Sequence, residues 1–181
     1  MKNIFLLIVF AKLLTSCASF TNPNSYLAES IANVVELQQL NGKFAVFQED
    51  CHEKNLVKAL HFDTEIECIE EQKDSYFVEL SVIDKNEILA KLFKGDFLLE
   101  EKKLKGNIKN NYFRKRTDFN FYIDYVILNS YTTDDTRIGL LQNNNLIVDT
   151  KGGACGLFVL FPIFCAGGDS NNNEFERLYE Y

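Results

Sequence analysis

The chain has 181 residues, with 26 acidic against 19 basic side chains, a formal net charge of −7, and 46% hydrophobic residues that include sixteen Phe and no Trp. The acidic balance excludes nucleic acid as a partner, because phosphate binding needs a basic face. The apolar content excludes a disordered chain, and the length suits one domain with a packed core.

Residues 1–16 are predicted to be a signal peptide. An apolar run, Ile4–Ala11, follows the positive charge of Lys2. A membrane-spanning helix needs ~20 apolar residues, whereas the apolar region of a signal peptide needs only about 7–15. No stop-transfer cluster follows Cys17. Loss of Lys2 and Lys12 with the signal brings the net charge to about −9.

The end of this segment, Leu14-Thr15-Ser16-Cys17, resembles the lipobox of bacterial lipoproteins. The resemblance implies cleavage before Cys17, a diacylglyceryl group on its thiol, and an acylated amino terminus. Several acyl chains anchor a protein stably, at ~0.8 kcal/mol per buried CH₂. Ala18 resembles the outer-membrane sorting signal of enteric bacteria, which places the protein in the envelope, facing the periplasm. The alternative is cleavage after Ala18, with Cys17 incidental.

Four cysteines remain after Cys17: Cys51, Cys68, Cys155 and Cys165. An even number in an exported chain predicts disulfides, and four cysteines allow three pairings. We favour Cys51–Cys68 and Cys155–Cys165, because each pair brackets one hairpin-sized segment. Closing a loop of about 15 residues contributes ~3 kcal/mol in the chain-entropy model. The alternative is buried free thiols in a reduced compartment.

Residues 17–24 are expected to form a lipidated tether, and residues 25–181 a single β-rich domain. The segment "SYLAESIANVVELQQLNG" places apolar residues at helical spacing and predicts a helix that ends at Asn41-Gly42. A second, short helix is predicted in "CHEKNLVKALHF", with Leu56 and Leu60 facing inward.

The remaining chain is predicted to form roughly nine or ten short strands, because alternating apolar segments are separated by turns every 8–12 residues. The predicted turns are "DKN", "KGD", "TDDT", "NNN" and "KGG", with a loop at "DSNNNE". Such spacing predicts a mainly β fold, an antiparallel meander that closes into a barrel or forms a sandwich. Closure would remove exposed sheet edges.

A helix that ends in "LNGKF" before a meander of hairpins is similar to lipocalin-like β-barrel lipoproteins of bacteria. Gly42-Lys43-Phe44 occupies the place where lipocalins open their first strand. The resemblance implies an up-and-down barrel after one helix, and it transfers no ligand-binding residue to this chain.

No catalytic residue, metal site or cofactor is predicted. His52, His61, Asp63 and Glu65 lie near one another, but without the spacing of a zinc site, so a solvated acidic loop is expected. Cys155 in "GGACG" has no His nearby in the sequence to activate it.

Two further segments allow alternatives. "GLFVLFPIF" predicts a strand buried on both sides, with Pro162 at a sheet edge or a bulge; the alternative is an apolar lip for a ligand, a partner or a lipid surface. Arg114, Lys115 and Arg116, among aromatic residues, predict an alternating strand whose basic face is solvated.

The sequence therefore predicts a non-enzymatic binding or envelope-accessory lipoprotein. Its expected partners are the membrane, through the lipid, and either a small apolar ligand or another envelope protein. The alternatives are an envelope hydrolase with dispersed residues, and an inhibitor or immunity-type lipoprotein. A pocket where a His and carboxylates converge would favour the hydrolase.

Overall fold

The computed structural model describes residues 34–48, 55–115, 118–123, 128–158 and 161–179. The predicted signal peptide, the tether and most of the predicted first helix lie outside these ranges. The elements in chain order are α2 (Val34–Leu37), η1 (Gln38–Leu40), β1 (Gly42–Ala45), α3 (Leu56–Ala59), η2 (Glu70–Ser75), β2 (Tyr76–Asp84), β3 (Glu87–Lys94), β4 (Phe97–Lys109), β5 (Tyr112–Lys115), β6 (Asp118–Ile123), β7 (Leu128–Leu140), β8 (Leu146–Phe158), β9 (Phe161–Phe175) and β10 (Arg177–Leu178).

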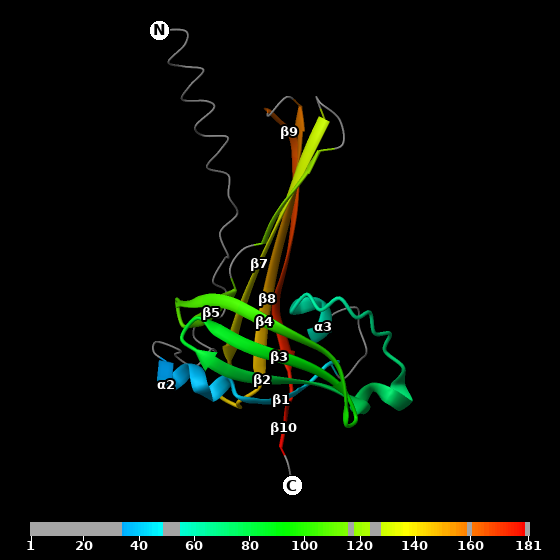
Figure 1. The fold of residues 1–181 in the computed structure, drawn as a ribbon, viewed down its shortest axis with the longest axis vertical. Helices are drawn as coiled ribbons and strands as arrows, with labels where there is room; N and C mark the ends of the chain where they lie inside the picture. Colours follow the sequence, from blue (N-terminus) through cyan, green and yellow to red (C-terminus); the bar gives the residue numbers. More distant parts are fainter. Residues whose placement is uncertain (1–33, 49–54, 116–117, 124–127, 159–160, 180–181) are drawn as a thin grey trace.

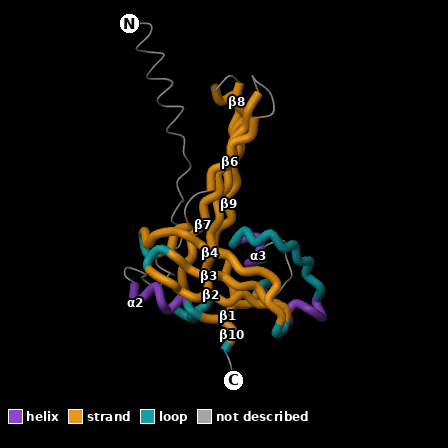
Figure 2. Tube along the Cα trace, in the orientation of Figure 1, coloured by secondary structure: helices purple, strands orange, loops and turns teal. Residues whose placement is uncertain are grey.

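The molecule has two parts, a wide body and a narrow arm (Figures 1 and 2). The arm consists of β6 and the outer halves of β7, β8 and β9, which are residues 118–123, 128–134, 152–158 and 161–168. All other described residues form the body. The strands β7 to β9 begin or end inside the body and continue without a break into the arm.

All strands belong to one antiparallel sheet, in the order β10-β1-β2-β3-β4-β5-β7-β8-β9, with β6 added to β7. The predicted antiparallel meander is therefore present. The sheet is not closed into a barrel, and the predicted lipocalin-like barrel is not confirmed. The physical reason is the length of β7, β8 and β9, which have 13, 13 and 15 residues. Their outer halves extend away from the core instead of curving around it.

The chain itself brings the two ends of the strand order together, because only Glu176 separates β9 from β10. Arg177 secures this junction. Its Nη2 and Nη1 donate to the carbonyl oxygens of Gln39 (2.6 Å) and Asn41 (3.0 Å), and its Nε donates to the carbonyl oxygen of Asn144 (3.0 Å). The guanidinium also lies over the ring of Phe44, 4.9 Å from its centroid.

The core lies on the inner face of the body sheet. Alternation along β3 buries Ile88, Ala90 and Leu92, since side chains of a strand point alternately to its two faces. The short helix α3 closes the core with Leu56 and Leu60, which are fully buried as predicted. The body halves of β7 and β8 contribute Ile138, Leu140, Leu146 and Val148.

The front of the chain agrees with the sequence in part. Residues 34–40 are helical, as α2 and η1, and end at Asn41, where the predicted helix also ends. Within the described residues, no helix is long and apolar enough to cross a bilayer.

Three predicted breaks are wrong. "TDDT", "KGG" and "DSNNNE" lie inside the continuous strands β7, β8 and β9. The register brings them to one level of the sheet, where Asp134 is opposite Gly152 and Gly152 is opposite Gly168. At this level the strands leave the core. The polar residues and glycines therefore occur where the core ends, and the chain does not turn there.

Candidate functional site

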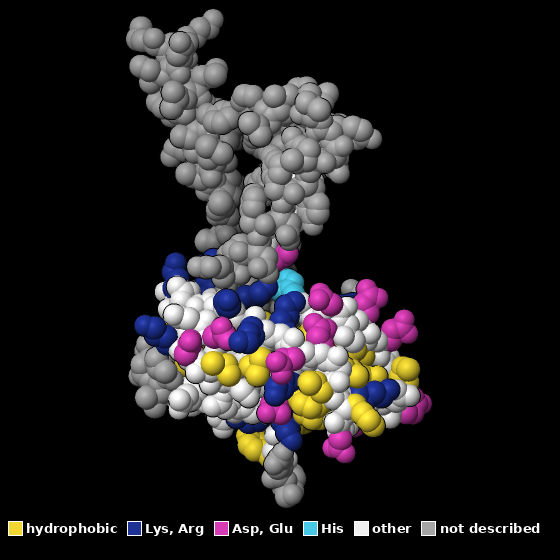
Figure 3. Space-filling view, viewed as in Figure 1, with side chains coloured by type: hydrophobic (Ala, Val, Ile, Leu, Met, Phe, Trp, Pro, Cys, Tyr) yellow, Lys and Arg dark blue, Asp and Glu magenta, His cyan; other side chains and the backbone are white. Residues whose placement is uncertain are grey.

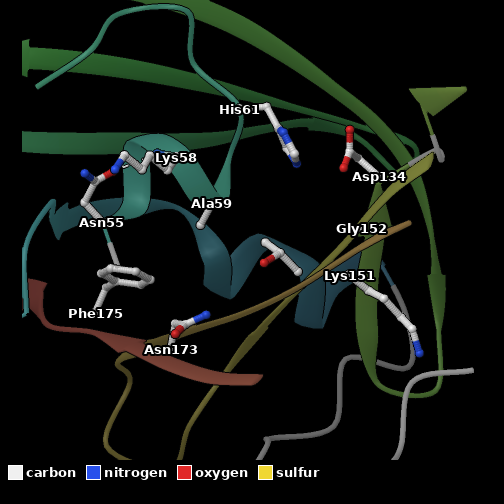
Figure 4. A pocket seen from close by; sticks show the side chains of 10 residues that line it. Asn55, Lys58, Ala59, His61, Asp134, Lys151, Gly152, Asn173 and Phe175 are labelled. Carbon is white, nitrogen blue, oxygen red and sulfur yellow. Dashed lines mark hydrogen bonds between the residues drawn. The ribbon is translucent and has the colours of Figure 1, made fainter. Parts of the chain in front are cut away.

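The candidate site is a pocket of about 210 Å³ where the arm leaves the body (Figure 4). The helix α3 and the loop after it supply one wall, and β7, β8 and β9 supply the other. The residues that line it are Asn55, Lys58, Ala59, His61, Asp134, Thr150, Lys151, Gly152, Asn173 and Phe175.

Asn55 fixes the start of α3. Its side-chain oxygen accepts a hydrogen bond from the backbone N–H of Lys58 at 2.7 Å, which is the usual role of Asn at a helix N-cap. Only 6% of Asn55 is exposed. The cap therefore places the helix, and with it the wall of the pocket, against the sheet.

His61 occupies a conformation that is uncommon for a residue with a side chain. Its φ is 58°, in the left-handed region, directly after α3. Two contacts hold it there: its Nε2 is 3.2 Å from the hydroxyl oxygen of Thr136, and its carbonyl oxygen accepts a hydrogen bond from Lys102 Nζ. The imidazole is therefore fixed at the mouth of the pocket.

Asp134 stands at the same end of the pocket as His61, whereas Lys151 is directed away from it (Figure 4). Gly152, opposite Asp134 in the ladder, leaves room for this carboxylate. A Cβ on Gly152 would lie 3.1 Å from Asp134 Oδ1, which is tighter than an ordinary contact.

A buried ion pair lies on β7 and β8 next to the pocket. Arg137 Nε donates to Asp149 Oδ2 at 2.6 Å, and the two side chains are only 9% and 1% exposed. The guanidinium of Arg137 is also 4.5 Å from the centre of the Tyr112 ring. Burial raises the pKa of Tyr112, with the positive charge of Arg137 acting against this and Asp149 adding to it.

The hydroxyl of Thr136, 3.2 Å from His61 Nε2, belongs to a residue that is only 1% exposed, so this hydroxyl is out of reach of a substrate. Among the described residues, no three His, Cys, Asp or Glu side chains are placed to hold a metal ion.

The arm is the second candidate surface. Its register places Phe121, Tyr131, Cys155 and Cys165 in one row across the four strands, and Asn120, Thr132, Ala154 and Ala166 in the next. Neighbouring rows belong to opposite sides of a β-ribbon. Apart from Asp118 and Asp134 at its base, the described residues of the arm are uncharged. Ala154 and Ala166 are exposed.

The predicted cysteine sites are placed only in part. Cys17 and Cys51 lie outside the described residues. The sulfur of Cys68 takes part in a disulfide. Cys155 and Cys165 are directly opposite each other on β8 and β9, a Cα spacing that a disulfide can span. Both pairings remain predictions.

The basic strand differs from its prediction. Lys115 is buried, with 7% exposed, and Arg114 is held by an ion pair with Asp135, so this side of β5 is not simply solvated. Lys and Arg side chains gather on the part of the body nearest the arm (Figure 3). A hollow of about 610 Å³ is lined by basic and acidic side chains, which are Lys105, Lys109, Arg114, Lys115, Asp84 and Glu87.

Other predicted residues fall in different places. Asp63 and Glu65 are exposed, as expected for a solvated loop, whereas His61 belongs to the pocket. His52 and Arg116 lie outside the described residues. Pro162 is on the edge strand β9 beside a bulge, which confirms its expected place.

Analysis of the residue pattern alone does not identify Asn55, Thr136 and Asn173 as part of this region. Asn55 carries a recognisable signal, since Asn three residues before a helical lysine is a normal cap. Asn173, only 3% exposed, donates to the carbonyl oxygen of Val148, and it was hidden in the loop-like run "DSNNNE".

The chain matches no protein-family model, no curated protein and no solved structure at a significant level.

Proposed function

We propose that this protein is a lipid-anchored protein of the bacterial cell envelope, held in the outer membrane on its periplasmic side, with a non-enzymatic binding function. The lipobox-like residues Leu14-Thr15-Ser16-Cys17 and the four remaining cysteines support the anchor and the oxidising compartment. The anchor fixes where the protein acts, and the arm is the surface with which it binds.

One observation carries the binding role, namely that β7, β8 and β9 continue out of the packed body and are joined by β6 in an arm whose sequence carries charge only at its base. Uncharged strand edges outside a core are templates for pairing with another strand. The body already has its own core, so the outer strands add nothing that the fold of the body requires.

The anchor is tested by the intact mass of the native protein, measured with and without reduction. We expect a chain that begins at Cys17, carries acyl groups, and changes mass on reduction by the hydrogens of two disulfides. A Cys17→Ala variant should leave the membrane fraction. Native material that begins at Met1 without lipid would overturn the proposal.

The binding role of the arm is tested by limited chymotrypsin digestion of isolated envelopes and of purified protein at high dilution. Aromatic sites within residues 118–123 and 161–168 should be protected in the envelope and cleaved after dilution. Phe97, which is 77% exposed on the body, should be cleaved in both samples. Equal cleavage of the arm in both would contradict the proposal.

One observation favours an envelope hydrolase as a second candidate: His61 and Asp134 line one pocket. A hydrolytic activity of the purified protein that is abolished by His61→Ala but retained by Phe97→Ala, a change outside the pocket, would establish that alternative.

A further inference from the structure

We propose that the partner of the arm is a second copy of this chain, and that β6 of one copy pairs with the outer half of β9 of the next. This inference names the partner for the proposed binding role and rests on that role, but not on the lipid anchor. The junction would extend the antiparallel sheet from one arm into its neighbour.

The first argument is that the arm has two open edges. Among the described residues, β6 pairs only with β7, and residues 161–168 of β9 pair only with β8. The backbone N–H and C=O groups along such an edge are a template for another strand. Proteins usually block such edges with charged residues or proline.

The second argument is that these edges are weakly blocked. Phe119–Ile123 on β6 and Ile163–Gly168 on β9 contain no charged residue and no proline. Charged residues flank these stretches at the base of the arm, in Asp118 and Asp169, and Pro162 with the bulge at Ile163 ends the second one at the tip. The pairing surface is thus limited to about five residues on each edge, a usual strand length.

The third argument is the direction of the strands. The arm has four of them, so β6 runs away from the body and β9 runs back toward it. When two arms point the same way, β6 of one and β9 of the other are therefore antiparallel. An odd number of strands would bring parallel edges together, a pairing that is slightly less stable per residue.

The fourth argument is that the two edges lie at the same height. Ile123 shares a row with Asn129, Leu157 and Pro162, and Asp118 shares a row with Asp134, Gly152 and Gly168. Residues 118–123 and 162–168 therefore cover the same stretch of the arm. A bulge at Ile163 adds one residue to β9, so the two edges are in step over residues 118–122 and 164–168, and two arms side by side can pair along these residues.

A lipid surface satisfies these features less well. A bilayer core offers no hydrogen-bonding groups to unpaired backbone N–H and C=O groups. A second copy offers an edge of matching length and opposite direction. Because the two edges are different surfaces, the contact is heterologous, and it either closes into a ring or grows into an open chain.

Sedimentation velocity of the full mature chain in detergent micelles, over a concentration series, tests this pairing. We expect the wild type to form species of two or more copies. Phe121→Lys on β6 and Ile163→Lys on β9 should each reduce the protein to a monomer, since charged side chains block edge pairing. Phe97→Lys on the body is the matched control and should assemble like the wild type.

Mixing the two arm variants gives the sharpest result. Phe121→Lys retains an intact β9 edge and Ile163→Lys retains an intact β6 edge, so an equimolar mixture should form a heterodimer, although each variant alone is a monomer. Recovery of the dimer also shows that both variants are folded, a point that thermal unfolding of each variant checks independently.

Three results would overturn the inference. The first is a wild-type monomer at every concentration, which leaves the protease protection of the arm as evidence for a different partner. The second is a wild-type dimer that only one of the two substitutions abolishes and that mixing of the variants does not restore. Such a result indicates a symmetric contact, in which each copy uses the same edge. The third is binding of wild-type monomers to phosphatidylglycerol vesicles without self-association, which assigns the arm to lipid.

Discussion

The inner and outer halves of β7, β8 and β9 belong to the same three strands and the same ladder, yet they differ in burial and in amino-acid composition. The inner halves bury Ile138, Leu140, Leu146 and Val148 completely. The outer halves begin with Gly152 and Gly168, and Ala154 and Ala166 beyond them are exposed. The comparison teaches that the residue types along these strands change where the strands leave the core, whereas the backbone pairing between the strands continues across that point.

The largest effect that tests this comparison is expected at Phe113, which is fully buried in the body. Phe113→Ala should lower the free energy of unfolding by about 3–5 kcal/mol, because it removes an aromatic ring and leaves a cavity. Urea unfolding followed by circular dichroism measures this. The control is Phe97→Ala, whose side chain is 77% exposed and whose loss should change stability by less than ~0.5 kcal/mol. Equal losses would mean that the core is elsewhere.

The buried ion pair should come next. Asp149→Asn leaves Arg137 buried without its counter-charge and should cost about 3 kcal/mol. The matched change Glu101→Gln removes a carboxylate from the exposed pair with Lys91 and should cost below ~1 kcal/mol. Both variants are measured by urea unfolding, and a small loss for Asp149→Asn would show that water reaches the base of the arm.

Replacement of one glycine in the body and one in the arm by alanine compares the packing of the two parts, with a smaller expected change in the free energy of unfolding. A Cβ on Gly106 would lie 2.3 Å from the carbonyl oxygen of Arg114, so Gly106→Ala must move backbone and should cost about 1–3 kcal/mol. At Gly168 no atom lies within 4 Å of an added Cβ, and Gly168→Ala should stay within ~0.5 kcal/mol. Thermal unfolding of both variants measures these changes. A loss of stability in Gly168→Ala would mean that other atoms are packed against this part of the arm.

The hydrogen bonds of Glu100, which connect β4 to the loop after α3, should make the stability of the protein depend on pH. Glu100 accepts hydrogen bonds from Thr64 N (2.9 Å), Thr64 Oγ1 (2.8 Å) and Asp63 N (3.1 Å). Burial alone would raise the pKa of Glu100, but these bonds and the charge of Lys102 lower it.

Because the folded pKa lies below the unfolded value, the carboxylate of Glu100 stabilises the protein above that unfolded value, about 4.3. Its contribution disappears as the pH falls through the lowered pKa. Glu100→Gln should cost about 1 kcal/mol near neutral pH. The difference from wild type should shrink as the pH falls, and a constant difference across the titration would contradict this role of the charged carboxylate.

The smallest effect is expected from removal of the arm. An Asn-Gly turn can join Lys115 of β5 to Thr136 of β7, because the pair Arg114–Arg137 places these ends opposite each other. A second Asn-Gly turn can join Lys151 of β8 to Asp169 of β9, which are paired directly. The shortened chain should keep cooperative unfolding, with a change below ~1 kcal/mol, since the core is retained. Loss of cooperativity would show that body and arm fold as one unit.

Much of the body could be predicted from its sequence. The alternation in β2 and β3 and the turns at Lys85-Asn86 and Gly95-Asp96 are local signals, and the structure follows them. The short helix with Leu56 and Leu60 inside is equally local. Each of these features depends on residues within one hairpin or one helical turn, which is the range over which periodicity is informative.

The arm and the pocket could not be predicted for the opposite reason. Asp134, Gly152 and Gly168 are distant in sequence and only the register brings them to one level. Read singly, each polar segment has the composition of a turn. Likewise, His61 and Asp134 meet at one pocket because β7 passes the end of α3, which no spacing along the chain encodes.

The direct passage from β9 into β10 has a mechanical consequence. Any tension applied to the arm along β9 is transmitted through Glu176 to β10, whose register with β1 comprises only Lys43–Leu178 and Phe44–Arg177. So short a ladder would yield early under load. The guanidinium of Arg177 donates to three carbonyl oxygens, two at the end of η1 and one in the turn between β7 and β8, and so distributes the force into the rest of the body.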